Sequence, residues 1–164
     1  MNNVLDLNEN KKILKFPEGF LWGTSTSAYQ IEGGNHNDWS EWERSVRRRE
    51  WLKRKKKNVF DFQSGAACDS YHRFIEDFEL AKKLNNNVIR LGIEWSRIQP
   101  ERDTWNVKEI DHYREILAAA KSRGLATIVT LWHTTIPLWL KNEKGWLNKK
   151  AADHFATYVD LVVR

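Results

Sequence analysis

The feature that most limits the fold is an alternation of strand-like and helix-like segments along the 164 residues. Three short apolar segments resemble strands, and after each comes a segment whose apolar side chains recur every three or four residues. The strand-like segments are 21–25, 87–93 and 125–131, and the helical ones begin near residues 69, 106 and 148. Strands that alternate with helices favour parallel βα units. We therefore predict an α/β fold built on a parallel sheet.

Residues that commonly start or stop helices mark the boundaries of the helical segments. Asp69 is expected to cap the first helix. Asn106 and Glu109 resemble a capping box for the second, and Gly124 is expected to end it. Asn148 is expected to cap the third helix.

Three parallel strands with their helices make only part of a known fold. Both edges of the sheet would be unpaired. A closed eight-stranded βα barrel needs roughly 250 residues, and a flavodoxin-like sheet needs about five strands. A dinucleotide-binding fold would carry a glycine fingerprint after its first strand, and this sequence has none there. We expect residues 16–164 to be the front part of a larger α/β domain, preceded by a flexible polar lead-in at 1–15.

Composition excludes several protein classes. No apolar run approaches the roughly 18 residues of a membrane helix, so no membrane partner is expected. The first residues lack the basic and apolar regions of a secretory signal, which favours a cytoplasmic protein. Cys68 is the only cysteine, which excludes internal disulfides and a cysteine-based zinc site. We expect neither a metal nor a cofactor.

Positive charge is concentrated in residues 44–57, which hold nine Lys and Arg and one acid, Glu50. This segment carries +8, which leaves −3 for the rest of a chain whose formal net charge is +5. A nucleic-acid-binding face would explain the run. A basic surface connection, which is a solvated helix or loop anchored by Trp51 and Leu52, is favoured over it because charge runs are usually solvated faces.

Three polar residues fall on or just beyond the strand-like segments: Gln30 after the first, Arg90 within the second and His133 after the third. In parallel sheets, functional side chains collect at the carboxyl ends of the strands. Strand alternation places Arg90 on the face opposite Ile89 and Leu91, where a buried guanidinium needs a carboxylate partner. The alternatives are a structural ion pair for the arginine and a structural role for the histidine.

Four segments resemble one enzyme family. They are 16–33 (FPEGFLWGTSTSAYQIEG), 37–43 (NDWSEWE), 88–97 (VIRLGIEWSR) and 129–133 (VTLWH). In order and spacing they are similar to glycoside hydrolase family 1, the β-glucosidase and β-galactosidase family. The nine tryptophans agree with carbohydrate handling, since an indole ring suits the apolar face of a sugar, although packing is the expected role of most of them.

The resemblance implies a TIM (β/α)8 barrel of which this chain supplies the first three βα units. It implies that Gln30 and His133 bind hydroxyls of the sugar in the −1 subsite. It also implies that Arg90 lies beside the nucleophilic carboxylate and keeps it ionised and oriented. Thr134 departs from the family, which usually has an aromatic residue directly after this histidine, so one wall of the site is expected to differ.

The two catalytic carboxylates of the family are expected beyond residue 164. In the family, the acid/base glutamate lies in an Asn-Glu-Pro motif after the fourth strand, and the nucleophile lies in a Glu-Asn-Gly motif after the seventh. Asn142-Glu143-Lys144 and Glu9-Asn10-Lys11 match these motifs only in part and follow no predicted strand. The prediction is the N-terminal portion of a retaining β-glycosidase, inactive alone, that acts on small β-glucosides or related sugars.

Partners and an alternative function follow from the same residues. A non-catalytic sugar-binding or regulatory remnant would use Gln30 and His133 without hydrolysis. The expected partners are a small carbohydrate substrate and a complementing C-terminal portion. Self-association through the open strand edges is a further expectation.

Overall fold

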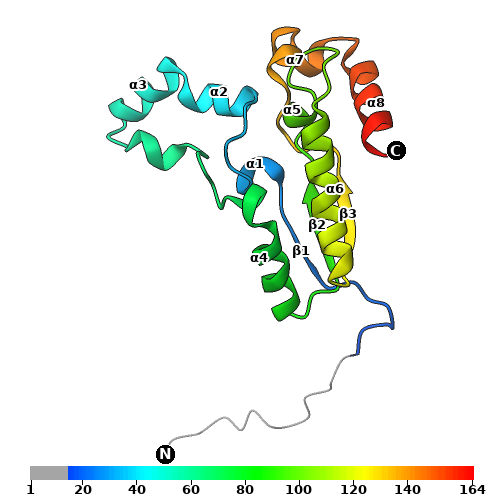
Figure 1. Cartoon of the computed structure of the whole chain (residues 1–164). Helices are drawn as coiled ribbons and strands as arrows, with labels where there is room; N and C mark the ends of the chain where they lie inside the picture. The colour runs from blue at the N-terminus through cyan, green and yellow to red at the C-terminus, as the bar shows by residue number, and fades with distance from the viewer. Residues whose placement is uncertain (1–14) are drawn as a thin grey trace, which may run out of the picture.

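One small parallel sheet organises the fold. The computed structural model describes residues 15–164 and pairs its three strands in the order β1-β2-β3 (Figure 1). The strands are β1 (Gly23–Ser25), β2 (Val88–Gly92) and β3 (Ala126–Thr130), inside the three predicted segments. Ser25, Arg90 and Ile128 lie side by side in the parallel register. Except for Lys15, the predicted lead-in lies outside the described residues.

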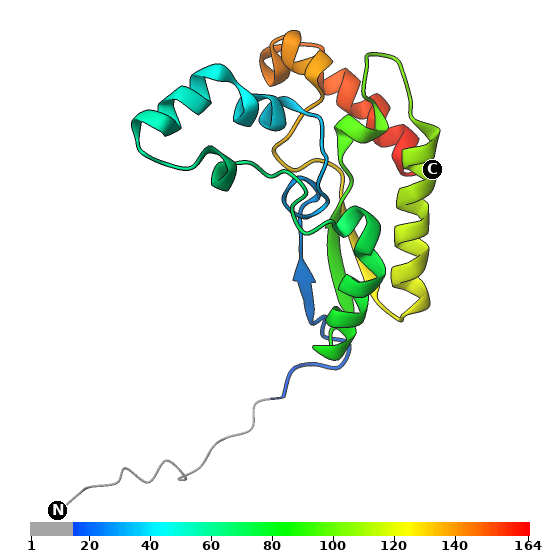
Figure 2. The same cartoon turned by 60° about the vertical axis from the view of Figure 1, so that its left-hand side comes forward.

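Two long helices cover one face of this sheet. Figures 1 and 2 show α4 (Ser70–Lys83) and α6 (Val107–Ser122) alongside the strands. Their apolar residues, three or four positions apart, pack with Ile89 and Leu91 of β2 in one core, which includes Phe78, Ala81, Tyr113, Ile116 and Ala120. Strand alternation therefore predicted the helix-covered face of β2 correctly.

The boundaries of α4 and α6 follow the local sequence, with one correction. The Asn106 side chain accepts a hydrogen bond from the Glu109 N–H at 3.4 Å, and Gly124 follows α6 with a φ of +68°. Asp69 precedes α4 as predicted, but its φ is +55° and its side chain caps no backbone amide. Its Oδ1 lies 2.7 Å from the side-chain Nδ1 of His72 instead, so the carboxylate pairs with a side chain of the first turn and not with a backbone amide.

The segment between β3 and α8 (Ala151–Val162) holds two short helices that the sequence pattern did not predict. They are α7 (Leu138–Asn142) and η2 (Gly145–Leu147). Asn148 does not cap α8, because Lys150 occupies the N-cap position. The Asn148 side chain instead accepts a hydrogen bond from the Lys150 N–H at 3.0 Å.

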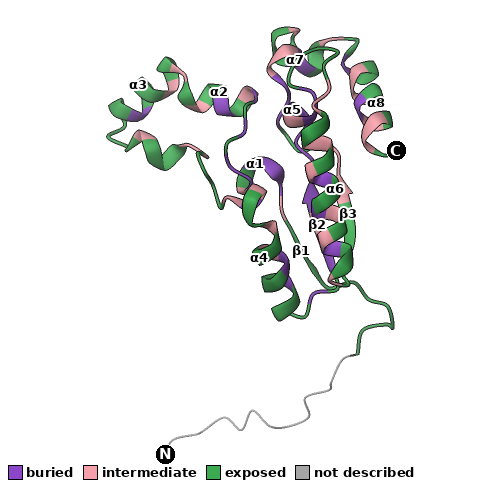
Figure 3. Cartoon of the chain, viewed as in Figure 1, coloured by how far each residue is buried: buried purple, intermediate pink, exposed green. Residues whose placement is uncertain are grey.

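The sheet face opposite α4 and α6 is largely uncovered. All of β1 and the first three residues of β3 are exposed, and Ile128 keeps 49% of its surface in solvent (Figure 3). Parallel strands are normally covered on both faces. The sheet with its helices is therefore consistent with part of a barrel, in which this bare face would point inward.

A helical excursion leaves the sheet after β1. It begins with α1 (Ala28–Ile31) and continues through α2 (Asp38–Arg44), α3 (Val46–Arg54) and η1 (Val59–Phe62). Figures 1 and 2 show α2 and α3 standing away from the sheet. The basic stretch 44–57 is thus mostly helix, one of the two forms expected for it, and the Ser45 side chain caps α3 by accepting from the Arg48 N–H at 3.2 Å. We call residues 38–63 the basic arm.

Aromatic side chains join the ends of the sheet to α7 and α8. Trp95 begins the short helix α5 (Trp95–Ile98), is 1% exposed and stacks on Tyr158 at a centroid distance of 5.1 Å. Phe155, Trp139 and Trp146 surround this pair. Six of the nine tryptophans are more than a third exposed, so burial in this core accounts for few of them: Trp22, Trp39, Trp42, Trp51, Trp132 and Trp146.

Candidate functional site

The three polar residues predicted from the sequence lie at one edge of the sheet. Gln30 is in α1, just after β1, Arg90 is in β2, and His133 lies just beyond β3. Because the strands are adjacent and parallel, their carboxyl ends meet at the same edge. Gln30 and His133 thus follow the strands at this edge and Arg90 lies two residues before the end of β2, although no hydrogen bond joins their side chains to one another within residues 15–164.

Arg90 is half-buried and bonded only to hydroxyl groups. Its Nε donates to Thr130 Oγ1 at 2.7 Å, and one terminal nitrogen donates to Ser25 Oγ at 2.9 Å. These partners belong to β3 and β1, so the guanidinium bridges all three strands on the uncovered face. In the part of the chain that the structure describes, no carboxylate lies within ion-pair distance of Arg90. Its remaining donors are available to an anion from elsewhere.

Gln30 and His133 present their polar groups to solvent. Both are exposed, and the Gln30 Oε1 accepts a hydrogen bond from Ser27 Oγ at 2.8 Å, which orients the amide. An amide offers both a donor and an acceptor, and a neutral imidazole offers one of each. These groups are suited to pairs of sugar hydroxyls at the open edge of the sheet.

The loop that carries His133 is held in a tight turn. Thr134 has a φ of +68°, which is unusual for a β-branched residue. The Thr135 N–H donates to the His133 carbonyl at 2.8 Å, and Trp132 Nε1 donates to the Thr135 carbonyl at 2.9 Å. Strained backbone persists only where its surroundings fix it, and it clusters at functional sites. The position of the His133 backbone is therefore fixed by its neighbours.

A buried carboxylate joins the loops that follow the three strands. Glu94 is 3% exposed, and its Oε1 accepts hydrogen bonds from Asn37 Nδ2 at 3.3 Å and from Ser96 Oγ at 2.7 Å. Thr135 Oγ1 donates to the Glu94 Oε2 at 2.9 Å. Asn37 follows β1, Glu94 follows β2 and Thr135 follows β3. This network fixes the loop of His133 relative to the two neighbouring loops.

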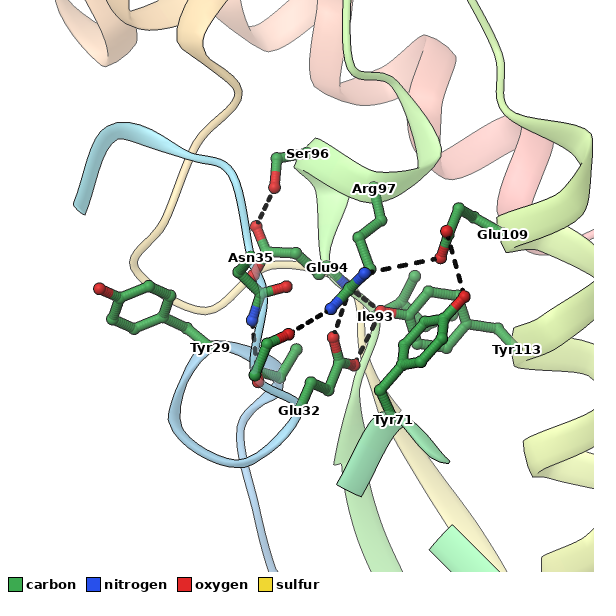
Figure 4. A network of polar contacts seen from close by, with 12 residues as sticks. Tyr29, Glu32, Asn35, Tyr71, Ile93, Glu94, Ser96, Arg97, Glu109 and Tyr113 are labelled. Atoms are coloured by element: carbon green, nitrogen blue, oxygen red, sulfur yellow. Dashed lines mark hydrogen bonds and ion pairs between the residues drawn. The ribbon is translucent and has the colours of Figure 1, made fainter. Parts of the chain in front are cut away.

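A second buried network anchors the end of α1 (Figure 4). Glu32 is 6% exposed and accepts hydrogen bonds from Arg97 Nε and from the Tyr113 hydroxyl, both at 2.8 Å. Burial raises the pKa of Glu32 to about 7, because the loss of solvent outweighs the opposing effects of Arg97 and Tyr113. The guanidinium also lies 4.3 Å from the centre of the Tyr71 ring.

Gly33 lets the chain approach this network closely. A terminal nitrogen of Arg97 donates to the Gly33 carbonyl at 2.6 Å. Gly33 has a φ of +79°, and a Cβ there would lie 2.2 Å from the Ala66 carbonyl oxygen. Only glycine fits such a position without strain. Glu32 and Gly33 together tie the end of α1, and hence Gln30, to the loop after β2.

The raised pKa of Glu32 predicts how stability depends on pH. Between about pH 4.5 and 7 the folded state binds more protons than the unfolded state, so the unfolding free energy falls as the pH rises through this range. The stabilisation is fully present below the unfolded-state pKa and amounts to roughly 3 kcal/mol. Urea denaturation at several pH values, followed by tryptophan fluorescence, measures it. Glu32→Gln should have a flatter profile in this window, and an unchanged slope would contradict the assignment.

Glu32, Glu94, Arg97 and Tyr113 were not predicted as supporting residues. Glu94 and Arg97 do carry a signal, because they are opposite charges within an otherwise apolar part of the 88–97 motif. Tyr113 occupies an ordinary apolar position of α6, and only the folded structure brings its hydroxyl to Glu32.

Other features of the described residues do not define a competing site. A hollow of about 270 Å³ lies between α4 and the sheet, but it is on the helix-covered face and none of the three candidate residues lines it. Residues 15–164 contain no cluster of three His, Cys, Asp or Glu side chains that could hold a metal ion. Among the same residues, no helix combines the length and apolar character needed to cross a bilayer.

A parallel sheet with one bare face and a polar carboxyl edge is the arrangement that part of a βα-barrel enzyme presents. The family model described as Glycosyl hydrolase family 1 matches residues 12–164, and the chain belongs to this family.

The relatives include enzymes of bacteria, archaea and plants. Beta-glucosidase A of Thermotoga maritima is 38% identical over 151 residues, which cover 89% of this chain and 32% of the relative. A beta-glycosidase structure from Pyrococcus horikoshii is 37% identical with a TM-score of 0.75, covering 91% of this chain and 33% of that one. A rice beta-glucosidase mutant, solved in a covalent complex with Glc, is 34% identical with a TM-score of 0.78, covering 89% and 30%. The chain thus spans about a third of the length of these relatives.

Proposed function

We propose that this chain supplies the first three βα units of a retaining β-glycosidase. The enzyme would hydrolyse O-glycosidic bonds of small β-glucosides or related sugars. Gln30 and His133 bind hydroxyls of the sugar in the −1 subsite, and Arg90 supports the nucleophilic carboxylate. The catalytic acid/base and nucleophile are supplied by further βα units outside residues 1–164.

The observation that carries this proposal is the state of Arg90. A half-buried guanidinium that is bonded only to two hydroxyls has charge to spare for a carboxylate. The uncovered sheet face on which it lies would become the interior of a closed barrel, where an unpaired cation is costly. A carboxylate from a later strand would satisfy it, and that carboxylate would stay ionised at neutral pH.

A retaining mechanism assigns each group a task. Two carboxyl groups about 5–5.5 Å apart share the chemistry: one attacks the anomeric carbon, and the other protonates the leaving oxygen and then activates water. The covalent complex with Glc of the rice relative supports this route over an inverting one. Hydroxyl contacts from Gln30 and His133 tighten as the ring distorts toward the transition state, so they favour catalysis and not only binding.

A hybrid enzyme tests the sugar contacts. Residues 1–164 are joined to the remaining two thirds of the Thermotoga maritima relative, and hydrolysis of nitrophenyl β-glucoside is measured. Gln30→Ala and His133→Ala should each lower kcat/KM by roughly 5–10-fold, as expected for one lost hydrogen bond of about 1–1.5 kcal/mol. His72→Ala, which changes an exposed histidine of α4, should leave kcat/KM nearly unchanged. If His72→Ala and His133→Ala lower kcat/KM equally, the sugar-binding site does not lie at this edge of the sheet.

The same hybrid tests Arg90 through its pH profile. Arg90→Met should lower kcat by roughly 10–100-fold, since a charge-assisted hydrogen bond contributes about 1.5–3 kcal/mol. Without the guanidinium the pKa of the nucleophile rises, so the acidic limb of the kcat profile should move to higher pH. A variant that loses stability but keeps its acidic limb in place would make Arg90 a purely structural residue.

A further inference from the structure

The basic arm holds a concentration of charge that the proposed hydrolysis does not use. Eight of the nine cationic side chains in residues 44–57 are exposed. Within residues 15–164, none of the nine forms an ion pair. Glu50 and Asp61 are the acids of segment 44–63, and the neighbouring Glu43 is engaged, since its Oε2 accepts from the Ser64 N–H at 2.9 Å. Repulsion among so many cations is unfavourable unless an anion relieves it.

The ninth cation, Arg48, is only partly exposed and packs against aromatic rings of the arm. The Arg48 guanidinium lies 4.5 Å from the centre of the Trp42 ring, 4.8 Å from that of Trp51 and 5.7 Å from that of Phe62. These rings come from α2, α3 and η1, and Leu52 of α3 is 1% exposed. Stacking of this kind, with one buried leucine, fixes the three helices relative to one another. The remaining cations are therefore displayed on an ordered frame.

A hollow of about 500 Å³ lies between the three helices of the arm. Three of its lining residues are cationic and come from two helices: Arg44 of α2, with Arg49 and Lys53 of α3. Phe60 and Gln63 line the other side, and Phe60 keeps 79% of its surface exposed. Arg44 is oriented by a bond from its Nε to the Ser40 carbonyl at 3.0 Å. The hollow thus has a mostly apolar wall, to which three cationic residues, an open aromatic ring and a glutamine contribute.

We propose that this hollow binds an acidic glycan, a sugar chain that bears carboxylate or sulfate groups. Arg44, Arg49 and Lys53 pair with the anionic groups, and a guanidinium can bind a carboxylate or sulfate through two parallel hydrogen bonds. The Phe60 ring covers the apolar face of a pyranose, and Gln63 reaches its hydroxyls. The arm leaves the sheet at the carboxyl end of β1, so a bound chain lies on the side of the molecule that carries the candidate active site.

A glycan suits the arm better than a nucleic acid. Proteins that bind single strands present several free aromatic faces on which successive bases stack. Here Trp42 and Trp51 stack with Arg48, and among the described residues Phe60 is the one aromatic side chain that lines the hollow. The choice of a glycan also rests on the proposed function, because a glycosidase gains from holding a sugar chain near its site. Binding to the hollow itself requires no hydrolysis.

Binding to the whole chain tests the proposal. Fluorescently labelled octagalacturonate and a heparin octasaccharide serve as carboxylated and sulfated probes, with maltooctaose as the neutral probe and a single-stranded RNA octamer as the alternative. Anisotropy should show binding of both acidic glycans and none of maltooctaose. Raising the ionic strength from about 0.01 M to about 0.15 M should weaken binding, because the Debye length shortens from about 30 Å to about 8 Å.

Matched variants locate the site. Arg49→Gln/Lys53→Gln should raise the Kd for both acidic glycans at least about tenfold, since two charged contacts are lost. The control Lys108→Gln/Lys121→Gln removes the same charge from exposed positions of α6 and should change Kd less than about twofold. Phe60→Ala should weaken glycan binding without any change of charge. All four side chains changed to glutamine are exposed, so far-UV circular dichroism should be unaltered.

Three results would overturn the proposal. If the arm variant and the α6 variant raise the Kd for acidic glycans equally, net charge alone would explain the binding. Tighter binding of the RNA octamer than of either acidic glycan, through the same Arg49 and Lys53, would make the arm a nucleic-acid surface. Absence of acidic-glycan binding at low ionic strength would leave the hollow without this role. None of these outcomes depends on turnover, so each is distinguishable from a failure of the hybrid enzyme.

Discussion

Residues 1–164 on their own are expected to release nitrophenol from nitrophenyl β-glucoside or β-galactoside no faster than a buffer blank. Retaining hydrolysis needs a nucleophilic carboxylate and a second carboxyl group that protonates the leaving oxygen. At the candidate site, the described chain brings a guanidinium, an amide and an imidazole to the edge of the sheet, and none of these can form the glycosyl ester. Binding contacts without the reacting groups lower no barrier of this reaction.

The hybrid with the Thermotoga maritima relative is the matched positive control, because it restores the remaining strands. Activity in the hybrid together with its absence in residues 1–164 would place the carboxylates in the added portion. Turnover that copurifies with residues 1–164 and disappears in a Gln30→Ala/His133→Ala double variant would contradict the placement of the carboxylates in the added portion. A folded hybrid that hydrolyses neither substrate would contradict the proposed function itself.

The strands β2 and β3 were predictable because parallel strands, which are normally covered on both faces, are nearly continuous apolar runs. Residues 88–92 and 126–130 form β2 and β3 inside the predicted segments, with small differences at the ends. The arm was not predictable in the same way. Lysine and arginine favour helix, but they leave no apolar periodicity when Leu52 is the one buried residue of α3. Its helical state depends on Ser45 and on aromatic contacts made only after folding.

In the candidate site, too, some residues were predictable from the local sequence and others were not. Gln30, Arg90 and His133 follow from motif and strand position, which are local properties of the sequence. The buried partners that hold them do not, because Glu32 meets Tyr113 and Glu94 meets Thr135 across long separations in the chain. The sequence indicated such supporting residues only through charged side chains inside apolar segments. The partner of each was set by packing of α6 and of the loop after β3 against the sheet.

These two networks explain how an edge built from short loops can hold a fixed geometry. Gln30 lies in a helix of four residues, which has little stability of its own. The Glu32–Arg97 pair fixes the end of this helix, and Glu94 fixes the loop of His133 through Thr135. Supporting hydrogen bonds of this kind hold functional side chains near their productive geometry. Loss of either network should therefore disturb the positions of Gln30 and His133 as well as the fold.

Arg97→Met is expected to have the largest effect on stability. At about pH 8 it should lower the unfolding free energy by roughly 3–5 kcal/mol, because the buried Glu32 loses its counter-charge and must either stay unpaired or take up a proton. At about pH 5 the loss should be smaller, since Glu32 is then protonated in the folded state. Urea denaturation followed by tryptophan fluorescence measures both values.

The control for this prediction is Arg123→Met, which breaks the ion pair of Arg123 with the exposed Glu79. A surface pair of this kind contributes about 1 kcal/mol or less, and its loss should be nearly the same at both pH values. The double variant Arg97→Met/Glu32→Gln should regain most of the stability at pH 8, because it removes the unpaired charge and keeps an acceptor for the Tyr113 hydroxyl. Equal losses for Arg97→Met and Arg123→Met, or a loss for Arg97→Met that does not vary with pH, would show that Glu32 is not held by Arg97 in the way described. The pH dependence separates the loss of a charge partner from the simple loss of packing, since packing does not titrate.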